Sequence, residues 1–285
     1  MEILKTTSQM QAACGNFRRQ GKRIGLIPTM GALHAGHLSL VRAARGSCDV
    51  VAVSIFVNPA QFGPDEDFST YPRSLEQDCA LLQAEGVDLV FAPPVEDIYP
   101  PGTSTFVAVE GVSERLDGAS RPGHFRGVTT VVSKLFHIAM PQQAFFGQKD
   151  AAQVAVLSKM VRDLNMDVEL VICPIVREAD GLALSSRNAY LDRDHRRQAL
   201  VLNRAMARAQ ECALAGEHSS ARLLQEARAV IAYEPEVRID YLAAVNPETL
   251  EDVADVHEGA LIAVAAYVGP TRLIDNLLIS KSASV

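Results

Sequence analysis

Two histidines and two glycines in one short segment are the residues of this chain best suited to chemistry on a phosphate. The segment is Pro28-Thr29-Met30-Gly31-Ala32-Leu33-His34-Ala35-Gly36-His37. Imidazole nitrogens can bridge phosphate oxygens, and glycines let an anion approach the main chain closely. Main-chain N–H groups at the start of a helix favour the same negative charge. This chemistry suits a nucleoside triphosphate.

The residues on either side of the segment decide how much weight it carries, because a His-x-Gly-His tetrad also occurs in ordinary surface loops. An apolar run, Ile24 to Ile27, precedes it, and an amphipathic stretch, Leu38 to Ala44, follows it. This order predicts a strand, a tight loop and a helix, and open α/β sheets bind ligands at the carboxyl ends of their strands. No Gly-x-Gly-x-x-Gly fingerprint lies nearby, which argues against a dinucleotide cofactor.

Composition narrows the class of protein. The chain has 285 residues, 48% of them hydrophobic and 21% charged, which is ordinary globular composition with room for two domains. No apolar run reaches the roughly 18 residues that span a bilayer, and the N-terminus lacks a signal-peptide pattern. We therefore expect a cytoplasmic protein without a membrane partner. The five cysteines are widely spaced, so we expect unreactive thiols rather than a metal site or a disulfide framework.

The net charge of −7 indicates small-molecule substrates and no nucleic-acid partner, because a nucleic-acid backbone calls for a basic surface. An acidic protein that binds a polyanion must gather its positive charge locally. The candidates for that role are His34, His37, Arg121, Arg126, Lys149, Arg177 and Arg187.

Apolar runs alternate with helical patterns in the first part of the chain, which predicts an α/β fold with a Rossmann-like, doubly wound parallel sheet. The predicted strands are Lys22–Ile27, Val50–Phe56, Leu89–Ala92, Thr105–Val109, Ala144–Phe146 and Val168–Cys173, and the predicted helices lie near 37–46, 72–86, 125–139 and 150–163.

The pattern changes after about residue 176, where helices are followed by strands. Helical patterns at 192–215 and 219–232 precede strand-like runs at Val237–Val245, Ala260–Tyr267 and Arg272–Ile279. That order indicates a smaller α+β domain. We predict one domain at 1–175 and a second at 176–285, since Pro174 ends the last strand of the first.

Two polar segments directly follow predicted strands of the first domain. Asn58 and Gln61 offer amide donors and acceptors to a ligand there, although Asn and Pro also form simple turns. Lys149, in Phe146-Gly147-Gln148-Lys149-Asp150, could reach a phosphate. Asp150 could instead act only as a helix cap, with Lys149 merely exposed.

Two further segments are rich in hydrogen-bond donors. Val176 to Asn188 contains a glycine turn followed by Ser185, Ser186 and Arg187, which suit triphosphate oxygens but are also common in surface loops. Arg121 to Gly127 carries two arginines and a histidine. It is either an anion clamp or a solvated helix start.

Taken together, the segments closely resemble the pantoate-β-alanine ligase family of the nucleotidyltransferase superfamily, which carries the His-x-Gly-His loop. The resemblance runs from about Ile3 to Asp192 and continues more weakly beyond. The matching motifs, in family order, are Thr29-Met30-Gly31-Ala32-Leu33-His34-x-Gly36-His37, Phe56-Val57-Asn58-Pro59-x-Gln61-Phe62, Tyr71-Pro72-Arg73, Arg121-Pro122-Gly123-His124-Phe125, Phe146-Gly147-x-Lys149-Asp150 and Arg177-Glu178-x-Asp180-Gly181-Leu182-Ala183-x-Ser185-Ser186-Arg187-Asn188.

The resemblance implies ATP-dependent condensation of (R)-pantoate with β-alanine, through a pantoyl-adenylate intermediate and with Mg²⁺. The products are pantothenate, AMP and pyrophosphate, and the family also implies a homodimer. Pantoate needs no general base, because a carboxyl group with an ordinary pKa of about 4 is already ionised at neutral pH. The barrier is therefore electrostatic.

The resemblance also assigns residues. His34, His37, Lys149 and Arg187 are the expected catalytic groups, which neutralise phosphate charge, with His37 as proton donor. Gln61 and Gln153 would hold pantoate, and Gln61 would also lie beside β-alanine. The expected ATP-binding residues are Met30, Gly31, Ala32, Leu33, His34, Ala35, Gly36, His37, Gly147, Gln148, Lys149, Asp150, Val176, Leu184, Ser185, Ser186 and Arg187.

Three points stay open at this stage. No metal ligand is assigned beyond noting Asp78, because Gln77 separates it from Glu76. The second domain is a plausible lid that keeps water from the acyl adenylate. The competing functions are an adenylyltransferase acting on a phosphate-bearing acceptor and a nucleotide-sensing module without catalysis.

Overall fold

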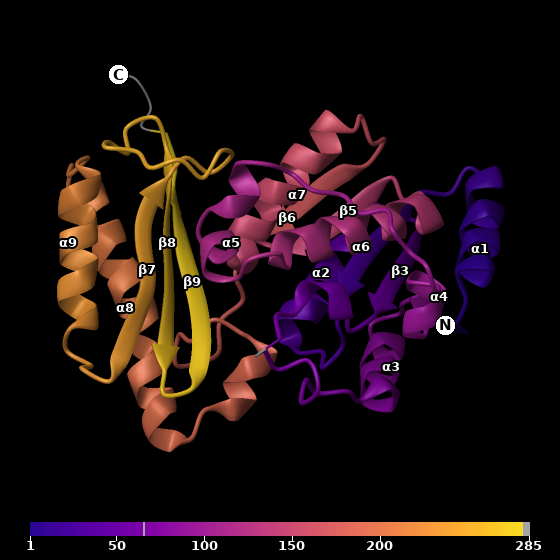
Figure 1. Ribbon diagram of the computed structural model, residues 1–285, viewed down its shortest axis with the longest axis horizontal. Helices are drawn as coiled ribbons and strands as arrows, with labels where there is room; N and C mark the ends of the chain where they lie inside the picture. Colours follow the sequence, from indigo (N-terminus) through magenta and orange to yellow (C-terminus); the bar gives the residue numbers. More distant parts are fainter. Residues whose placement is uncertain (65, 282–285) are drawn as a thin grey trace.

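A six-stranded parallel sheet forms the centre of the larger part of the molecule (Figure 1). The computed structural model describes residues 1–64 and 66–281. The strand order is β1-β4-β3-β2-β5-β6. The strands are β1 (Glu2–Leu4), β2 (Ile24–Thr29), β3 (Val50–Ile55), β4 (Leu89–Phe91), β5 (Gln143–Gly147) and β6 (Glu169–Cys173).

The order of the strands explains where a ligand can bind. The chain runs from β2 outward through β3 to β4, then returns to place β5 on the other side of β2. Ligands of doubly wound sheets bind at such a reversal point, beyond the carboxyl ends of the strands. The loop with both histidines leaves β2 there, and Lys149 follows β5.

Helices cover both faces of this sheet. They are α1 (Thr7–Arg19), α2 (Ala35–Ser47), α3 (Leu75–Ala84), α4 (Val95–Ile98), α5 (Asp117–Ser120), α6 (His124–Ala139) and α7 (Ala151–Asp163). Buried side chains of α1, α6 and α7 share one core with the sheet, while those of α2 and α3 pack into the core on its other face. Short 3₁₀ turns are η1 (Pro59–Gln61), η2 (Val112–Glu114), η3 (Gln148–Asp150) and η4 (Ser186–Tyr190).

The C-terminal part is a three-stranded antiparallel sheet with two helices. Its elements are α8 (Arg193–Leu214), α9 (Ser220–Ile231), β7 (Val237–Val245), β8 (Ala260–Val268) and β9 (Thr271–Ile279). In Figure 1 both helices lie on the side of this sheet that faces away from the six-stranded sheet. The predicted fold class, a Rossmann-like sheet with a smaller α+β part, is confirmed. The boundary at residues 175 and 176 stays a prediction.

The prediction of a strand at Thr105–Val109 is wrong. These residues, all within the described chain, form no strand and run over α6 instead. The main-chain N–H of Val107 donates to Oγ1 of Thr130 at 3.0 Å, and its carbonyl accepts from the hydroxyl of Thr129 at 2.7 Å. Helix hydroxyls thus satisfy the polar groups that a strand partner would otherwise take.

Two elements near the N-terminus were not predicted. Helix α1 begins at a capping box in which Thr6 and Gln9 satisfy each other's main-chain N–H groups, a signal that sequence alone could have revealed. Strand β1 has only three residues and pairs with β4 at the sheet edge, which is too short for a periodic pattern. Within the described residues, no helix is both long and apolar enough to cross a membrane.

Candidate active site

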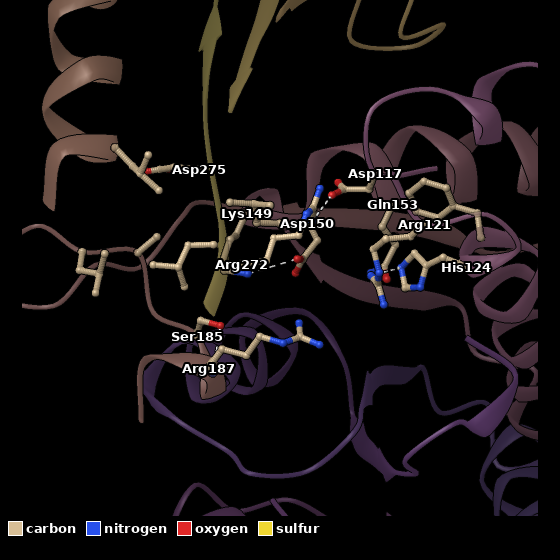
Figure 2. Close-up of a pocket in the computed structure, with 16 residues that line it drawn as sticks. Asp117, Arg121, His124, Lys149, Asp150, Gln153, Ser185, Arg187, Arg272 and Asp275 are labelled. Carbon is tan, nitrogen blue, oxygen red and sulfur yellow. Dashed lines mark hydrogen bonds and ion pairs between the residues drawn. The ribbon is translucent and has the colours of Figure 1, made fainter. Parts of the chain in front are cut away.

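Three adjoining cavities open at the carboxyl ends of β2 and β5, and Asp150 lines all of them. We name each by its characteristic side chains. The histidine cavity is lined by residues that include His34, His37, Lys149, Ser185 and Arg187. The glutamine cavity is lined by residues that include Asn58, Gln61, Gln153, Val128 and Phe146. The arginine cavity, shown in Figure 2, is lined by residues that include Asp117, Arg121, His124, Gln153 and Arg272.

Asp78 of α3 anchors the loop that carries the histidines. Its two carboxylate oxygens accept the main-chain N–H groups of Ala32, at 3.0 Å, and Leu33, at 2.8 Å. Only 2% of Asp78 is exposed, and burial raises its pKa while the two N–H bonds oppose that rise. Because both carboxylate oxygens bind the loop, Asp78 is a structural anchor of that loop.

His34 and His37 cap the N-terminus of α2. Nδ1 of His34 accepts the N–H of Gly36 at 3.2 Å, and Nδ1 of His37 accepts the N–H of His34 at 3.3 Å. The ring centroids are 4.1 Å apart. Since each Nδ1 is an acceptor, the proton of each neutral ring lies on Nε2. A Cβ at Gly36 would come within 2.9 Å of the His34 ring, which explains the glycine there.

Both histidines are neutral in this setting. Burial, followed by the charge of Lys149, lowers the pKa of His34 to about 4, and burial, followed by His34, lowers that of His37 to about 3. The two rings therefore offer N–H donors to the histidine cavity. The positive charge of this cavity is supplied by Lys149 and Arg187.

The end of β5 brings a cation and a carboxylate into the cleft. Nζ of Lys149 lies 3.3 Å from Oδ1 of Asp150. Burial is the largest single influence on the pKa of Asp150 and would raise it, but the charge and hydrogen bond of Lys149, together with the nearby His37 and Arg187, lower that pKa. Asp150 makes no side-chain capping bond to α7, so the interpretation of Asp150 as only a helix cap is wrong.

The segment Ser185–Arg187, before α8, forms another part of the wall of the histidine cavity. Ser185 caps η4, Ser186 lies 3.2 Å from the hydroxyl of Tyr71, and both serines line the histidine cavity. Arg187 makes a two-pronged ion pair with Asp67, at 3.1 and 2.8 Å. Its charge is thus already matched by a carboxylate that the sequence analysis did not single out.

The glutamine cavity combines an apolar wall with amides. Oε1 of Gln61 accepts from the Nδ2 of Asn58 at 3.0 Å, and Asn58 accepts from the hydroxyl of Tyr99 at 2.9 Å. Gln153 faces the same space, whose apolar walls include Val128 and Phe146. Such a lining suits a small molecule with methyl groups on one side and hydroxyls or a carboxylate on the other.

The arginine cavity answers the open question about the segment Arg121 to Gly127. Arg121 binds Glu66 at 2.6 and 2.7 Å and His124 at 2.9 Å, so these side chains form neither a solvated helix start nor a free anion clamp (Figure 2). Arg126 lies elsewhere, over the ring of Phe106 at 3.8 Å. Arg272 of β9 binds Asp117 at 2.7 Å.

Most of the predicted ATP-binding residues line the histidine cavity. They are Met30, His34, Gly36, His37, Gly147, Lys149, Asp150, Val176, Leu184, Ser185, Ser186 and Arg187. Gly31, Ala32, Leu33 and Ala35 lie outside that lining, and the side chain of Gln148 points instead to Asn276 of β9, at 3.1 Å. The sequence analysis missed Leu40, Pro174 and Ile175 as lining residues, which carry no polar signal. What each residue binds stays a prediction.

Metal ligands are sparse at the site. Across residues 1–64 and 66–281, no group of three or more His, Cys, Asp or Glu side chains is arranged to hold a metal ion. Mg²⁺ is commonly bound by one or two carboxylates together with phosphate oxygens and water. Asp150 is a carboxylate of that kind within the cleft.

The sheet reversal and the three joined cavities define an α/β protein of the Rossmann type that binds small polar ligands. The family model described as "Pantoate-beta-alanine ligase" matches residues 2–278. A pantothenate synthetase of Koribacter versatilis is 62% identical over 282 residues, 99% of this chain and 97% of that protein. One of Acidobacterium capsulatum is 64% identical over 293 residues, covering 99% and 98%.

Solved structures agree. The pantothenate synthetase of Thermus thermophilus is 50% identical with a TM-score of 0.93, covering 97% of this chain and 99% of that one. The pantoate-β-alanine ligase of Francisella tularensis, solved in complex with βγ-ATP and β-alanine, is 34% identical with a TM-score of 0.80, covering 98% and 97%. This chain belongs to the pantoate-β-alanine ligase family, which confirms the resemblance of its motifs.

Proposed function

We propose that this chain condenses (R)-pantoate with β-alanine at the described cleft, using ATP and passing through pantoyl adenylate. The observation that carries the proposal is the shared wall of two cavities: Met30, His37, Tyr71 and Asp150 line both the histidine and the glutamine cavity. A phosphate in one and a carboxylate in the other would therefore meet beside His37. Holding two reactants in such contact removes much of the entropic barrier of their reaction.

ATP would occupy the histidine cavity, since N–H donors and the charges of Lys149 and Arg187 converge there. Pantoate would occupy the glutamine cavity, where Gln61 and Gln153 bind its hydroxyls and carboxylate without adding charge. β-Alanine would lie beside Gln61. The relative from Francisella tularensis, solved with βγ-ATP and β-alanine, supports both ligand classes.

The first step needs charge stabilisation and no base. A carboxylate oxygen of pantoate attacks the α-phosphorus of ATP, the bond from that phosphorus to its bridging oxygen breaks, and pyrophosphate leaves. Nε2–H of His34 and of His37 donates to phosphate oxygens, and Lys149 offsets their charge. In this scheme His37 acts as a hydrogen-bond donor through Nε2–H, because its ring is neutral and the step transfers no proton.

Arg187 requires an exchange of partners. It is paired with Asp67 in this structure, at 2.8 Å, so a phosphate must compete with that carboxylate for the guanidinium. An arginine can bind either group in the same two-pronged manner. Binding of ATP and release of Asp67 are therefore coupled.

The second step joins the amine to the acyl group. The β-alanine nitrogen, as the free amine, attacks the acyl carbon, the bond from that carbon to the AMP oxygen breaks, and a proton passes from the nitrogen to the phosphate of the departing AMP. Water must be excluded meanwhile, and we assign that role to residues 176–285, whose Asn276 donates to the main-chain oxygen of Lys149 at 2.9 Å. Small-angle scattering that is identical with and without ATP and pantoate would count against a closing lid.

Mg²⁺ belongs to the same proposal. Asp150 fits it as a carboxylate in the cleft, with phosphate oxygens and water as the remaining ligands. When bound, the ion would neutralise phosphate charge as pyrophosphate leaves.

A cytoplasmic location and a homodimer also belong to the proposal and rest on the family resemblance. Sedimentation equilibrium of the purified protein tests the dimer: a mass of twice the 30.8 kDa chain supports it, and the mass of one chain contradicts it.

The decisive experiment is isotope exchange between labelled pyrophosphate and ATP, with Mg²⁺ and pantoate present and β-alanine omitted. Exchange that requires pantoate is expected, because only an acyl adenylate lets pyrophosphate return to ATP. A folded protein that binds ATP but shows no exchange would contradict the proposal and favour another acceptor or a nucleotide-sensing module.

A further inference from the structure

A chain of four groups leads from the arginine cavity to the main chain of Gln61. Glu66 accepts two bonds from Arg121, at 2.6 and 2.7 Å, and also the N–H of Gly63, at 3.2 Å. Arg121 then donates from Nη1 to Nε2 of His124 at 2.9 Å. Nδ1 of His124 lies 2.8 Å from the carbonyl oxygen of Gln61.

The two hydrogen-bond partners of His124 allow only one neutral tautomer of its ring. A guanidinium has no acceptor, so Nε2 of His124 must accept from Arg121. A carbonyl oxygen has no proton, so Nδ1 must donate to Gln61. His124 is thus a neutral ring protonated on Nδ1, in agreement with its pKa, which burial and then the charge of Arg121 lower to about 4.

The bonded carbonyl belongs to the turn that presents the side chain of Gln61 to the glutamine cavity. Helix α6 lies directly against this turn, η1: a Cβ on Gly127 would come within 2.6 Å of the Gln61 Cα. The carbonyl of Gly127 also accepts from Nδ2 of Asn58 at 3.1 Å. The first turns of α6 therefore hold η1 at several points. The carbonyl of Gln61 itself accepts the short bond from His124, at 2.8 Å, and a longer one from Nη2 of Arg121, at 3.5 Å.

Both ring nitrogens of His124 are engaged inside the protein. Neither is left for a substrate, although the ring borders the arginine cavity. This separates His124 from His34 and His37, whose Nε2–H groups remain available to the histidine cavity. Any effect of His124 on the reaction must therefore pass through its two bonded partners, and of these Gln61 is the one that lines the glutamine cavity.

We propose that His124, oriented by Arg121 as the Nδ1-protonated tautomer, is a positioning residue that holds the Gln61 carbonyl and so aims the Gln61 amide at the acid substrate. The inference rests on the proposed function, in which pantoate is that substrate. This role concerns binding of the acid in the glutamine cavity and does not affect binding of ATP in the histidine cavity.

The test compares His124→Leu with His124→Asn in pyrophosphate–ATP exchange with β-alanine omitted. Leucine removes the donor, whereas asparagine keeps an N–H donor near the position of Nδ1. We expect His124→Leu to raise the KM for pantoate about tenfold, the effect of one lost hydrogen bond, and to leave the KM for ATP within about twofold. His124→Asn should recover most of the pantoate KM.

A matched control comes from the same helix. Nδ1 of His137 also lies 2.7 Å from a main-chain carbonyl, that of Ser133, but outside the three cavities. His137→Leu should leave the pantoate KM unchanged. If His124→Leu leaves it unchanged too, raises both KM values in proportion, or is not rescued by asparagine in folded protein, the proposal is wrong.

A second measurement reads the tautomer in the wild-type protein itself. Nitrogen-15 NMR of wild-type protein labelled at histidine distinguishes the two neutral tautomers, and the resonances of His124 can be assigned by their loss in His124→Asn. We expect Nδ1 of His124 to carry the proton, and a proton on Nε2 overturns the proposal. Failure of the proposed function is recognised separately, because wild-type protein would then show no pantoate-dependent exchange at all.

Discussion

Two helices of this protein begin with half-buried imidazoles, and the rings are used in opposite ways. At the start of α2, Nδ1 of His34 and of His37 accepts main-chain N–H groups, which leaves the Nε2–H donors for the cleft. At the start of α6, His124 accepts at Nε2 from Arg121 and donates from Nδ1 to a carbonyl. Burial is the largest cause of a lowered pKa at all three.

The difference shows that neither residue type nor burial decides the role of an imidazole here. The groups bonded to each ring do. A ring that uses one nitrogen to bond the main chain has the other nitrogen available for a ligand. A ring with both nitrogens bonded inside the protein can only position a neighbouring residue. Substitutions on the two sides separate imidazoles that contact a ligand from the imidazole that positions a neighbouring residue.

The largest effect is expected at His37, on the side that faces the ligand. His37→Ala should lower the rate of adenylate formation roughly 10²–10³-fold, as removal of one preorganised donor to a transition state typically does. Pyrophosphate–ATP exchange at saturating ATP and pantoate measures this rate. His257→Ala, at an exposed position in the second sheet's domain, is the control, and a His37→Ala enzyme with wild-type turnover would remove His37 from the mechanism.

The second largest effect is expected at Asp78, which anchors the loop before α2. Asp78→Ala removes two bonds from main-chain N–H groups to a buried carboxylate, so we expect the free energy of unfolding to fall by about 2–3 kcal/mol, together with activity. Urea denaturation measures the change. Glu76→Ala, on the exposed side of the same helix, should stay within about 0.5 kcal/mol of wild type. Equal stability of the two variants would show that the loop does not depend on Asp78.

Substitution of Gln61 tests the binding of the acid substrate in the glutamine cavity directly. Gln61→Ala should raise the KM for pantoate about tenfold and spare the KM for ATP, because the amide is assigned to pantoate alone in the first step. Steady-state exchange with each substrate varied in turn separates the two constants. Equal weakening of both would mean that the variant is misfolded or that the assignment to pantoate is wrong.

The smallest effect is expected in the way the free energy of unfolding depends on pH, through His124. The pKa of His124 is about 4 in the folded protein against an ordinary 6.5, so between these values the unfolded chain binds more protons and the free energy of unfolding falls as the pH drops. His124→Leu should reduce that slope by about one proton. Urea titrations of wild type and variant from pH 7 to 5 give the slopes, and identical slopes would contradict a neutral buried ring.

Sequence patterns were most successful where the structure is local. The buried strand β3 is apolar except for Ser54, and the loop after β2 combines turn residues with chemically distinctive side chains. The strand expected at Thr105–Val109 failed because its apolar residues pack onto α6, whose threonines bond its main chain. A pattern of hydrophobic residues does not say whether the surface that covers them is a strand or a helix.

The sequence by itself determined the α/β class, the order of the family motifs and most of the residues that line the histidine cavity, because periodicity and turn chemistry are properties of neighbouring residues. Tertiary structure alone decided which groups meet. Asp78 binds an N–H 45 residues away, Arg187 binds Asp67 across 120 residues, and the carbonyl that His124 holds is 63 residues away. Hydrogen bonds depend on distances of about 3 Å, and only the packed fold brings such distant residues that close.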